Sequence, residues 1–146
     1  MIYTRPTYKP QYENFIGGEW VAPTSGEYFD NISPVDGELL TRIPRSNEAD
    51  VEAAILAADK AFQSFKHTSV LERSNLLNKM ADAIEANLEK LAIAETLDNG
   101  KTIRETLAAD VPLVVDHFRY FASVIRAESG TVSDLDENTI SQEIHE

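Results

Sequence analysis

The stretch ETLDNGKTIRET, residues 95–106, decides how the chain is divided into elements. Its Asn99-Gly100 pair predicts a helix end, because glycine is favoured in the left-handed position just past a helix C-terminus. Thr102 and Glu105 have the spacing of a capping box, which opens a new helix. The stretch therefore predicts a helix, a glycine stop and a second capped helix in quick succession.

Downstream of this stretch, the pattern stays helical up to Ser129-Gly130, where a stop is expected. Pro112 lacks a backbone donor, so it either kinks the helix that starts near Thr102 or sits in the first turn of a new one. One apolar stripe follows the proline at helical spacing. Its members are Val115, Phe118, Ala122 and Ile125.

Upstream, the chain predicts three more helices. Asn47 or Ser46 caps the first, and residues 69–72 (SVLE) have the capping-box form that opens the second. Asn87 marks a break before the third, which runs to Asn99. The first helix carries an apolar stripe at helical spacing, made of Val51, Ala54, Ile55, Ala58, Phe62 and Phe65. Something must cover this stripe, and the rest of the sequence offers little covering surface.

The N-terminal part predicts an extended arm and two short hairpins. Residues 1–14, with two prolines and mixed charge, indicate an arm without regular structure. Gly17-Gly18 suits a tight hairpin turn with positive φ, between strands at 15–16 and 20–21. Residues 28–32 and 39–43 predict a second hairpin, with a turn at the Pro-Val-Asp-Gly of residues 34–37.

The C-terminal part predicts an acidic loop at 131–138 (TVSDLDEN), followed by one strand, TISQEIHE, at 139–146. A strand needs a partner for its backbone N–H and C=O groups, and no sequence follows to supply one. We therefore expect Ile140 and Ile144 to be exposed or disordered, or to pair with a neighbouring copy of the chain.

Composition excludes several kinds of function. The net charge is −12, from 25 acidic and 13 basic residues, which argues against nucleic-acid and anionic-membrane partners. There is no cysteine, so a disulfide, a thiolate metal site and a cysteine nucleophile are excluded. His67, His117 and His145 lack metal-ligand spacing. With no secretory signal and no apolar run of membrane-spanning length, we expect a cytoplasmic location.

Several motifs in this order resemble the N-terminal region of the aldehyde dehydrogenase superfamily. ETLDNGK at 95–101 and ADVPLVVDHFRYFA at 109–122 are joined by five further matches, and the likeness covers about residues 13–146. Within this superfamily, the sequence is similar to the acetaldehyde-type, NAD-dependent subgroup. The five matches are FIGGEWV, NISPVDGELL, VEAAILAADKAF, ERSNLLNKMADAIEANLEKLA and ISQEIHE.

The resemblance implies an α/β parent fold with a Rossmann-type cofactor domain. This segment is expected to be mostly α-helical, with short N-terminal β-hairpins and one C-terminal strand. Residues 1–14 would be an extended arm, and 15–137 the N-terminal part of the cofactor-binding domain. Residues 138–146 would begin the bridging strand through which relatives form homo-oligomers.

The resemblance also implies the chemistry of a longer parent, in which a cysteine thiolate attacks the aldehyde and hydride passes to NAD or NADP. The catalytic cysteine, glutamate and asparagine of the family lie downstream of the matched region, as do its cofactor-binding residues. We therefore expect no catalytic or cofactor-binding residue here, no bound NAD or NADP, and no activity of the chain alone. The expected partner is the remainder of the aldehyde dehydrogenase chain.

One metal site is implied by the resemblance. Many relatives hold a structural Na⁺ or K⁺ on backbone carbonyls and an aspartate, which correspond here to Asn31, Ile32 and Asp98. A further ligand comes from beyond residue 146, so the site would be incomplete. Monovalent cations favour oxygen ligands, by extension from the divalent case. In the alternative interpretation, Asp98 caps nearby backbone N–H groups.

Two other hypotheses remain at the level of the sequence. The chain could be a stand-alone acidic helical module that binds a partner protein through its apolar helix faces. A small active enzyme is the third hypothesis, and the missing cysteine weighs against it.

Overall fold

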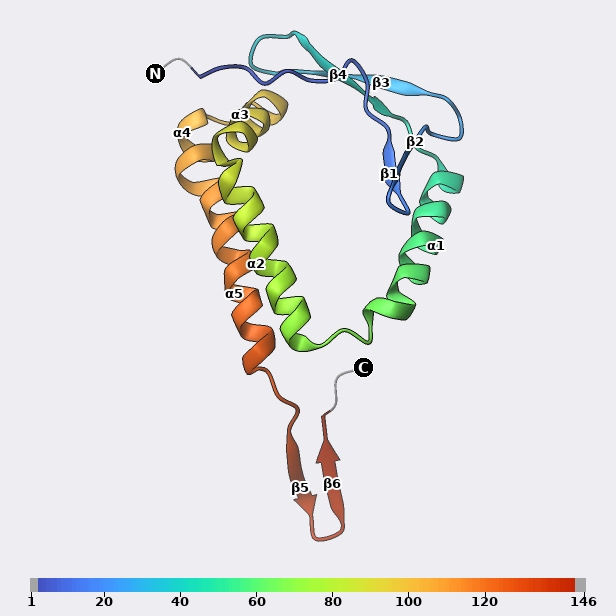
Figure 1. Ribbon diagram of the computed structural model, residues 1–146, viewed down its shortest axis with the longest axis vertical. Helices are drawn as coiled ribbons and strands as arrows, with labels where there is room; N and C mark the ends of the chain where they lie inside the picture. The colour runs from blue at the N-terminus through green and yellow to red at the C-terminus, as the bar shows by residue number, and fades with distance from the viewer. Residues whose placement is uncertain (1–2, 144–146) are drawn as a thin grey trace.

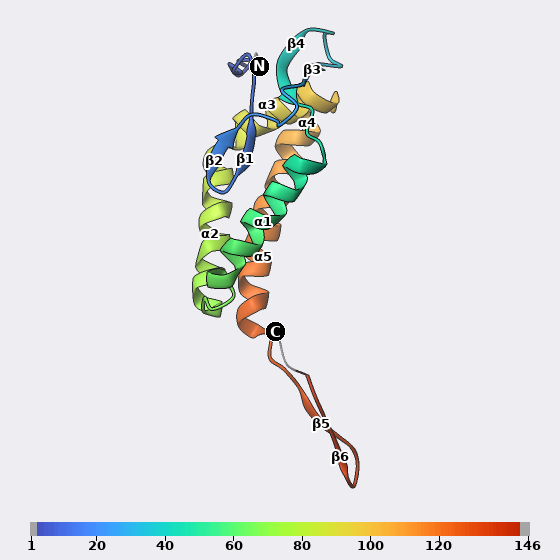
Figure 2. The same ribbon diagram turned by 90° about the vertical axis from the view of Figure 1, so that its right-hand side faces the viewer.

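A computed structural model of the chain describes residues 3–143. Four strands come first, then the helices, then two more strands, and the strands form three separate antiparallel pairs (Figures 1 and 2). The elements are β1 (Asn14–Ile16), β2 (Glu19–Val21), β3 (Tyr28–Ile32), β4 (Leu39–Pro44), α1 (Glu48–Phe65), α2 (Val70–Ala86), α3 (Leu88–Asn99), α4 (Ile103–Glu105), the π-helix η1 (Thr106–Asp110), α5 (Val111–Ala127), β5 (Val132–Asp136) and β6 (Thr139–Gln142).

The two N-terminal hairpins form as predicted. Gly17 and Gly18 turn the chain between β1 and β2 with φ of +64° and +89°, which side chains with a Cβ rarely adopt. Phe15 and Trp20 lie opposite each other in this hairpin, with ring centroids 5.0 Å apart. β3 and β4 form the second hairpin, and β4 runs one residue further than predicted, to Pro44.

The N-terminal arm lies along β4. The Tyr12 N–H donates to the Arg42 carbonyl at 2.9 Å, and the Arg42 N–H donates to the Pro10 carbonyl at 3.1 Å. Gln11 thereby forms a parallel bridge with Arg42. Of the predicted arm, residues 1–14, most of residues 3–14 lack regular structure as expected; the exceptions are this bridge and Asn14, with which β1 begins.

A polar cluster fixes the start of α1. Of the two predicted caps, Asn47 takes the position, and its side chain accepts from the Ala49 and Asp50 N–H groups. The Asp50 carboxylate is buried and accepts from the Asn47 N–H at 2.9 Å and the Thr24 N–H at 2.8 Å. These hydrogen bonds, first that from Asn47, lower the pKa of Asp50. The start of α1 is therefore tied to the loop that follows β2.

The apolar stripe of α1 is largely uncovered within the described residues, although the Arg73 guanidinium of α2 lies 5.5 Å from the centroid of the Phe65 ring. The helix forms over the predicted range, but Asp50 is its only buried residue. α1 stands apart from α2 and α5, which lie side by side (Figure 1). The large stripe side chains are exposed, at 54% for Val51, 56% for Ile55, 52% for Phe62 and 44% for Phe65.

The core of the chain includes the contact of α2 with α5 and extends to α3 and β4. Ser74 of α2 is buried and its hydroxyl donates to the Ala122 carbonyl of α5 at 2.6 Å. Ala81 and Ala122 are also buried, so the two helices meet through small side chains. At the surface, Arg119 reaches from α5 to Asp82 and Glu85 of α2, at 3.1 and 2.6 Å.

The stretch at 95–106 folds as predicted, with one addition. Gly100 ends α3 at φ +81°, and the Thr102 side chain caps α4 by accepting from the Glu105 N–H. α4 then widens into the π-helix η1, and Pro112 lies in the first turn of α5. A proline ring clashes with the carbonyl four residues before it in a regular helix, so the wider turn accommodates Pro112.

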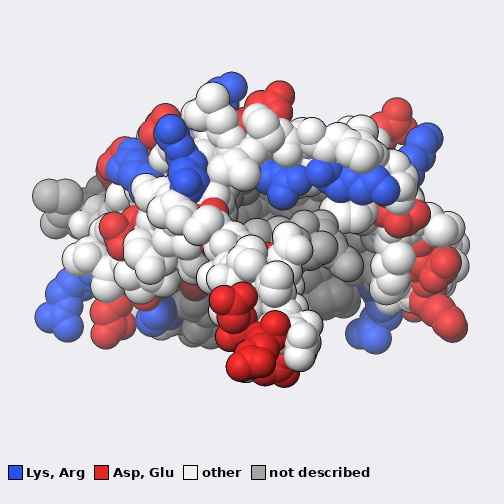
Figure 3. Space-filling view, turned by 90° about the horizontal axis from the view of Figure 1, so that it is seen from below, with Lys and Arg blue, Asp and Glu red and all other residues white. Residues whose placement is uncertain are grey.

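The C-terminal part differs from the prediction. The residues expected to form an acidic loop contain strand β5, which pairs with β6, so the terminal strand finds its partner within the chain. Ile140 is 67% exposed, as expected, while Ile144 lies outside the described residues. Acidic side chains cluster at the tip of this hairpin (Figure 3). The prediction of a loop was wrong because polar runs of this kind usually indicate loops.

We predict that Gly100→Ala destabilises the chain more than Gly26→Ala does. Both glycines have positive φ, which costs an alanine about 1 kcal/mol. A Cβ at Gly100 would also lie 3.1 Å from Pro34 Cγ, while at Gly26 it would meet nothing within 4 Å. Urea unfolding should give losses of about 2 and about 1 kcal/mol. Equal losses would show that the Pro34 contact relaxes without cost.

Candidate functional site

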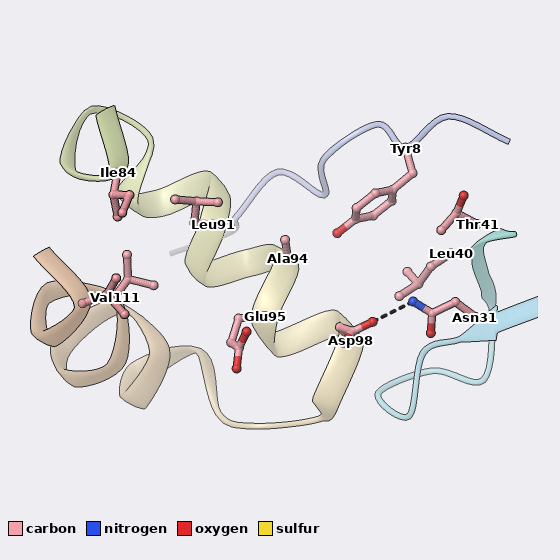
Figure 4. A pocket seen from close by; sticks show the side chains of 11 residues that line it. Tyr8, Asn31, Leu40, Thr41, Ile84, Leu91, Ala94, Glu95, Asp98 and Val111 are labelled. Carbon is pink, nitrogen blue, oxygen red and sulfur yellow. Dashed lines mark hydrogen bonds between the residues drawn. The ribbon is translucent and has the colours of Figure 1, made fainter. Parts of the chain in front are cut away.

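Two of the three residues predicted at a cation site meet here, but Asn31 makes the contact through its side-chain amide and not through the backbone carbonyl predicted as the ligand. Asn31 lies on β3 and Asp98 in the last turn of α3, and the Asn31 Nδ2 donates to Asp98 Oδ1 at 2.6 Å (Figure 4). Ile32 follows Asn31 at an irregularity in the pairing of β3 with β4. The β3–β4 hairpin and the C-terminal end of α3 therefore meet at this point.

The capping of backbone N–H groups, predicted as the alternative role of Asp98, is carried out by the neighbouring residue Asn99. Asn99 Oδ1 accepts from the Lys101 N–H at 2.8 Å, and so caps the backbone just past the end of α3. Among the hydrogen bonds of residues 3–143, Asp98 accepts from the Asn31 amide and from no backbone N–H group. One oxygen of Asp98 thus holds the hairpin, and a carboxylate has a second oxygen that can accept a ligand.

A cavity of about 500 Å³ adjoins this pair, between the N-terminal arm, the β3–β4 hairpin and the helices α2, α3 and α5. Its lining is mainly apolar, with acidic groups at Glu95 and Asp98 (Figure 4). The lining residues are Tyr8, Asn31, Leu40, Thr41, Ile84, Leu91, Ala94, Glu95, Asp98, Val111 and Val114.

Tyr8 brings the arm to this cavity, and sequence reasoning missed it. Its hydroxyl is buried and has no hydrogen-bond partner within the described part of the chain. Burial raises the pKa of this phenol, and the Asp98 carboxylate adds to the rise, while Arg5 opposes it. Tyr8 stands in a stretch of mixed polar and proline residues, which carries no signal of periodicity that could have placed it.

The site offers oxygen ligands and no group for covalent chemistry. Residues 3–143 contain no cluster of three His, Cys, Asp or Glu residues that could hold a metal ion. Of the three histidines, His145 lies outside the described residues. The sequence has no cysteine. The Asp98 carboxylate and nearby backbone carbonyls are oxygen atoms, which are the ligands that hard cations favour.

Comparison with known proteins identifies the family. A profile of the aldehyde dehydrogenase family matches residues 20–146. The chain is 63% identical over 139 residues to a long-chain-aldehyde dehydrogenase of an Acinetobacter species, covering 95% of this chain and 28% of that protein. It is 51% identical over 153 aligned residues to an acetaldehyde dehydrogenase of Pseudomonas aeruginosa, covering 100% of this chain and 30% of that protein. The chain belongs to the aldehyde dehydrogenase family.

Solved structures agree in fold. An indole-3-acetaldehyde dehydrogenase in its apo form superposes with a TM-score of 0.84 at 33% identity, over 92% of this chain and 31% of that one. PnpE, solved in complex with nicotinamide adenine dinucleotide, superposes with a TM-score of 0.83 at 37% identity, over 90% of this chain and 27% of that one. The chain therefore has the fold of an N-terminal segment of these α/β enzymes.

The chain spans less than a third of the length of these relatives. The family consists of oxidoreductases that use NAD or NADP. Within residues 3–143, none of the helices has the length and apolar character needed to cross a lipid bilayer.

Proposed function

We propose that this chain serves as the N-terminal scaffold of an enzyme that oxidises aldehydes to carboxylates with NAD or NADP. The observation that carries the proposal is its 63% identity to a long-chain-aldehyde dehydrogenase over 95% of its length. The names of the relatives favour an aliphatic substrate, either acetaldehyde or a longer aldehyde. The scaffold holds the β3–β4 hairpin against α3 through the Asn31–Asp98 contact.

The chain alone is expected to be inactive. Aldehyde oxidation through a thiohemiacetal needs a thiolate nucleophile, and the 146 residues contain no cysteine. Its contribution to catalysis is therefore structural: it supplies packed helices and a hairpin to a site whose reacting groups lie in the remainder of the enzyme.

A chimera tests this function. We expect this chain, placed in the Acinetobacter relative instead of its own matching segment, to give an enzyme that reduces NAD in the presence of an aldehyde. The isolated 146-residue chain should give no signal above buffer in the same spectrophotometric assay. Thiol alkylation should abolish the activity of the chimera, because the nucleophile is a cysteine. A folded chimera without activity, or an active isolated chain, would contradict the proposal.

We also propose a monovalent cation site formed by Asp98 and the backbone carbonyls of Asn31 and Ile32. The proposal is supported by the contact of β3 with α3. Asn31 Nδ2 lies 2.6 Å from Asp98 Oδ1, although the two residues are 67 positions apart in the sequence. The remaining ligand would come from another part of the enzyme, so the isolated chain should bind the ion more weakly than the chimera.

We predict that Na⁺ or K⁺ raises the melting temperature of the chimera through Asp98. At equal ionic strength, thermal unfolding in NaCl or KCl should occur at a higher temperature than in choline chloride, since an ion that binds only the folded state stabilises it. Asp98→Ala should remove the difference. Glu89→Ala, which removes an exposed carboxylate from the same helix, should leave it unchanged. Equal responses of the two variants would rule out this site.

A role in subunit assembly is proposed for the hairpin β5–β6. Isolated two-stranded hairpins are marginally stable in water, and this one exposes Val132, Leu135 and Ile140 at 67–68%. A further strand on its open edge would complete its hydrogen bonding and cover these side chains. A second subunit of the enzyme is the proposed source of that cover.

We predict that Ile140→Lys dissociates the assembled enzyme while Ser141→Lys does not. Ile140 pairs with Asp134 and Ser141 with Ser133, so the two side chains point to opposite faces of the hairpin. Light scattering of the chimera over a range of concentrations should show a smaller particle for Ile140→Lys alone. A monomeric parent chimera would contradict the proposed assembly.

The cytoplasmic location expected from the sequence stays a prediction.

A further inference from the structure

We infer that the apolar stripe of α1 is a docking surface for the part of the aldehyde dehydrogenase that lies beyond these 146 residues. The inference rests on the proposed function, because the occupant is the remainder of the same enzyme. The stripe consists of Val51, Ala54, Ile55, Ala58, Phe62 and Phe65.

The first support is that the stripe is largely uncovered although its sequence is that of a buried helix face. Val51, Ile55 and Phe62 are each more than half exposed. In proteins, most of the stability of a helix comes from the packing of its apolar face on other structure. Large contiguous apolar patches on proteins mark interaction sites. α1 therefore lacks, within the described residues, the contact that its sequence is built to make.

The second support is the way in which α1 is oriented. The buried Asp50 carboxylate ties the helix start to the Thr24 and Asn47 N–H groups, and the Thr24 hydroxyl donates to Asn47 Oδ1 at 2.9 Å. This polar cluster sets the direction of α1 without using the stripe. The α1 ribbon thus stands apart from α2 and α5 (Figure 1), and the stripe is left largely uncovered except at Phe65, over which Arg73 of α2 lies.

The third support is the shape of the surface beside the stripe. Two hollows of about 650 and about 610 Å³ lie along α1 and share Ala58 and Ala61. The first is closed on one side by the β1–β2 turn, where a Cβ on Gly17 would lie 3.9 Å from Ala57 Cβ. The second ends at Phe62 and Phe65. Small residues flanked by aromatic rings allow a neighbouring backbone to approach closely and be covered.

The length of the relatives identifies the occupant. This chain covers 28% of the Acinetobacter enzyme, so more than twice its own length of polypeptide remains to fill the surface. A second copy of the segment is a poorer occupant, since each copy carries a net charge of −12 and two copies repel each other. The stripe therefore fits a segment of the same enzyme better than a homodimer of this segment.

The test compares two neighbouring residues of α1. Ile55 lies on the stripe and Leu56 lies off it, about 100° further round the helix, and they are 56% and 60% exposed. In the chimera described above, Ile55→Ser should lower the melting temperature by several degrees and speed amide hydrogen exchange in α1 about tenfold. Leu56→Ser should change both much less. Should Ile55→Ser fail to fold, Ile55→Val provides the same comparison with Leu56→Val.

Three outcomes would overturn the inference. One is equal protection of the α1 amides in the isolated chain and in the chimera. Another is an equal effect of the Ile55 and Leu56 substitutions. The third is a dimer of the isolated chain that Ile55→Ser dissociates, which would make a second copy the occupant. A chimera with a protected α1 and no aldehyde oxidation would refute the proposed function alone.

Discussion

The close approach of α2 and α5 is the contact on which the rest of the chain depends. The small buried residues Ala81, Ala122 and Ser74 let the two helices approach closely. The Ser74 hydroxyl donates a hydrogen bond to the Ala122 carbonyl at 2.6 Å. Buried polar groups are tolerated when they are hydrogen-bonded in this way. The β3–β4 hairpin attaches to α3 through Asn31 and Asp98, and the start of α1 is tied through Asp50 to Thr24, in the loop between β2 and β3.

Local sequence signals predicted the structure correctly at helix ends and tight turns, where a few consecutive residues determine the backbone conformation. Asn47, Ser69 and Thr102 cap helices as predicted, and Gly17, Gly18 and Gly100 adopt the positive φ expected of them. Each of these features depends on hydrogen bonds and sterics within a few residues, so the sequence alone specifies them. The π-helix before Pro112 was not predicted, because a proline permits several local solutions.

Features that depend on distant residues were harder to predict. The pairing of β5 with β6 was missed because Asp134 and Asp136 give the strand a polar composition, and a fully exposed hairpin lacks the apolar alternation that marks a half-buried strand. The contact of Asn31 with Asp98 was expected only from the family resemblance. Tyr8 was missed because its burial depends on helices some 80 residues away.

The polar anchoring of α1 also has a consequence in time. During synthesis the N-terminal segment leaves the ribosome first, and the longer remainder of a relative takes on the order of tens of seconds to follow. Because Asp50, Asn47 and Thr24 are all within this segment, α1 can take its direction before any occupant exists. During that interval Ile55 and Phe62 are exposed to water. The nascent enzyme therefore carries an exposed hydrophobic surface that promotes aggregation and that chaperones can bind.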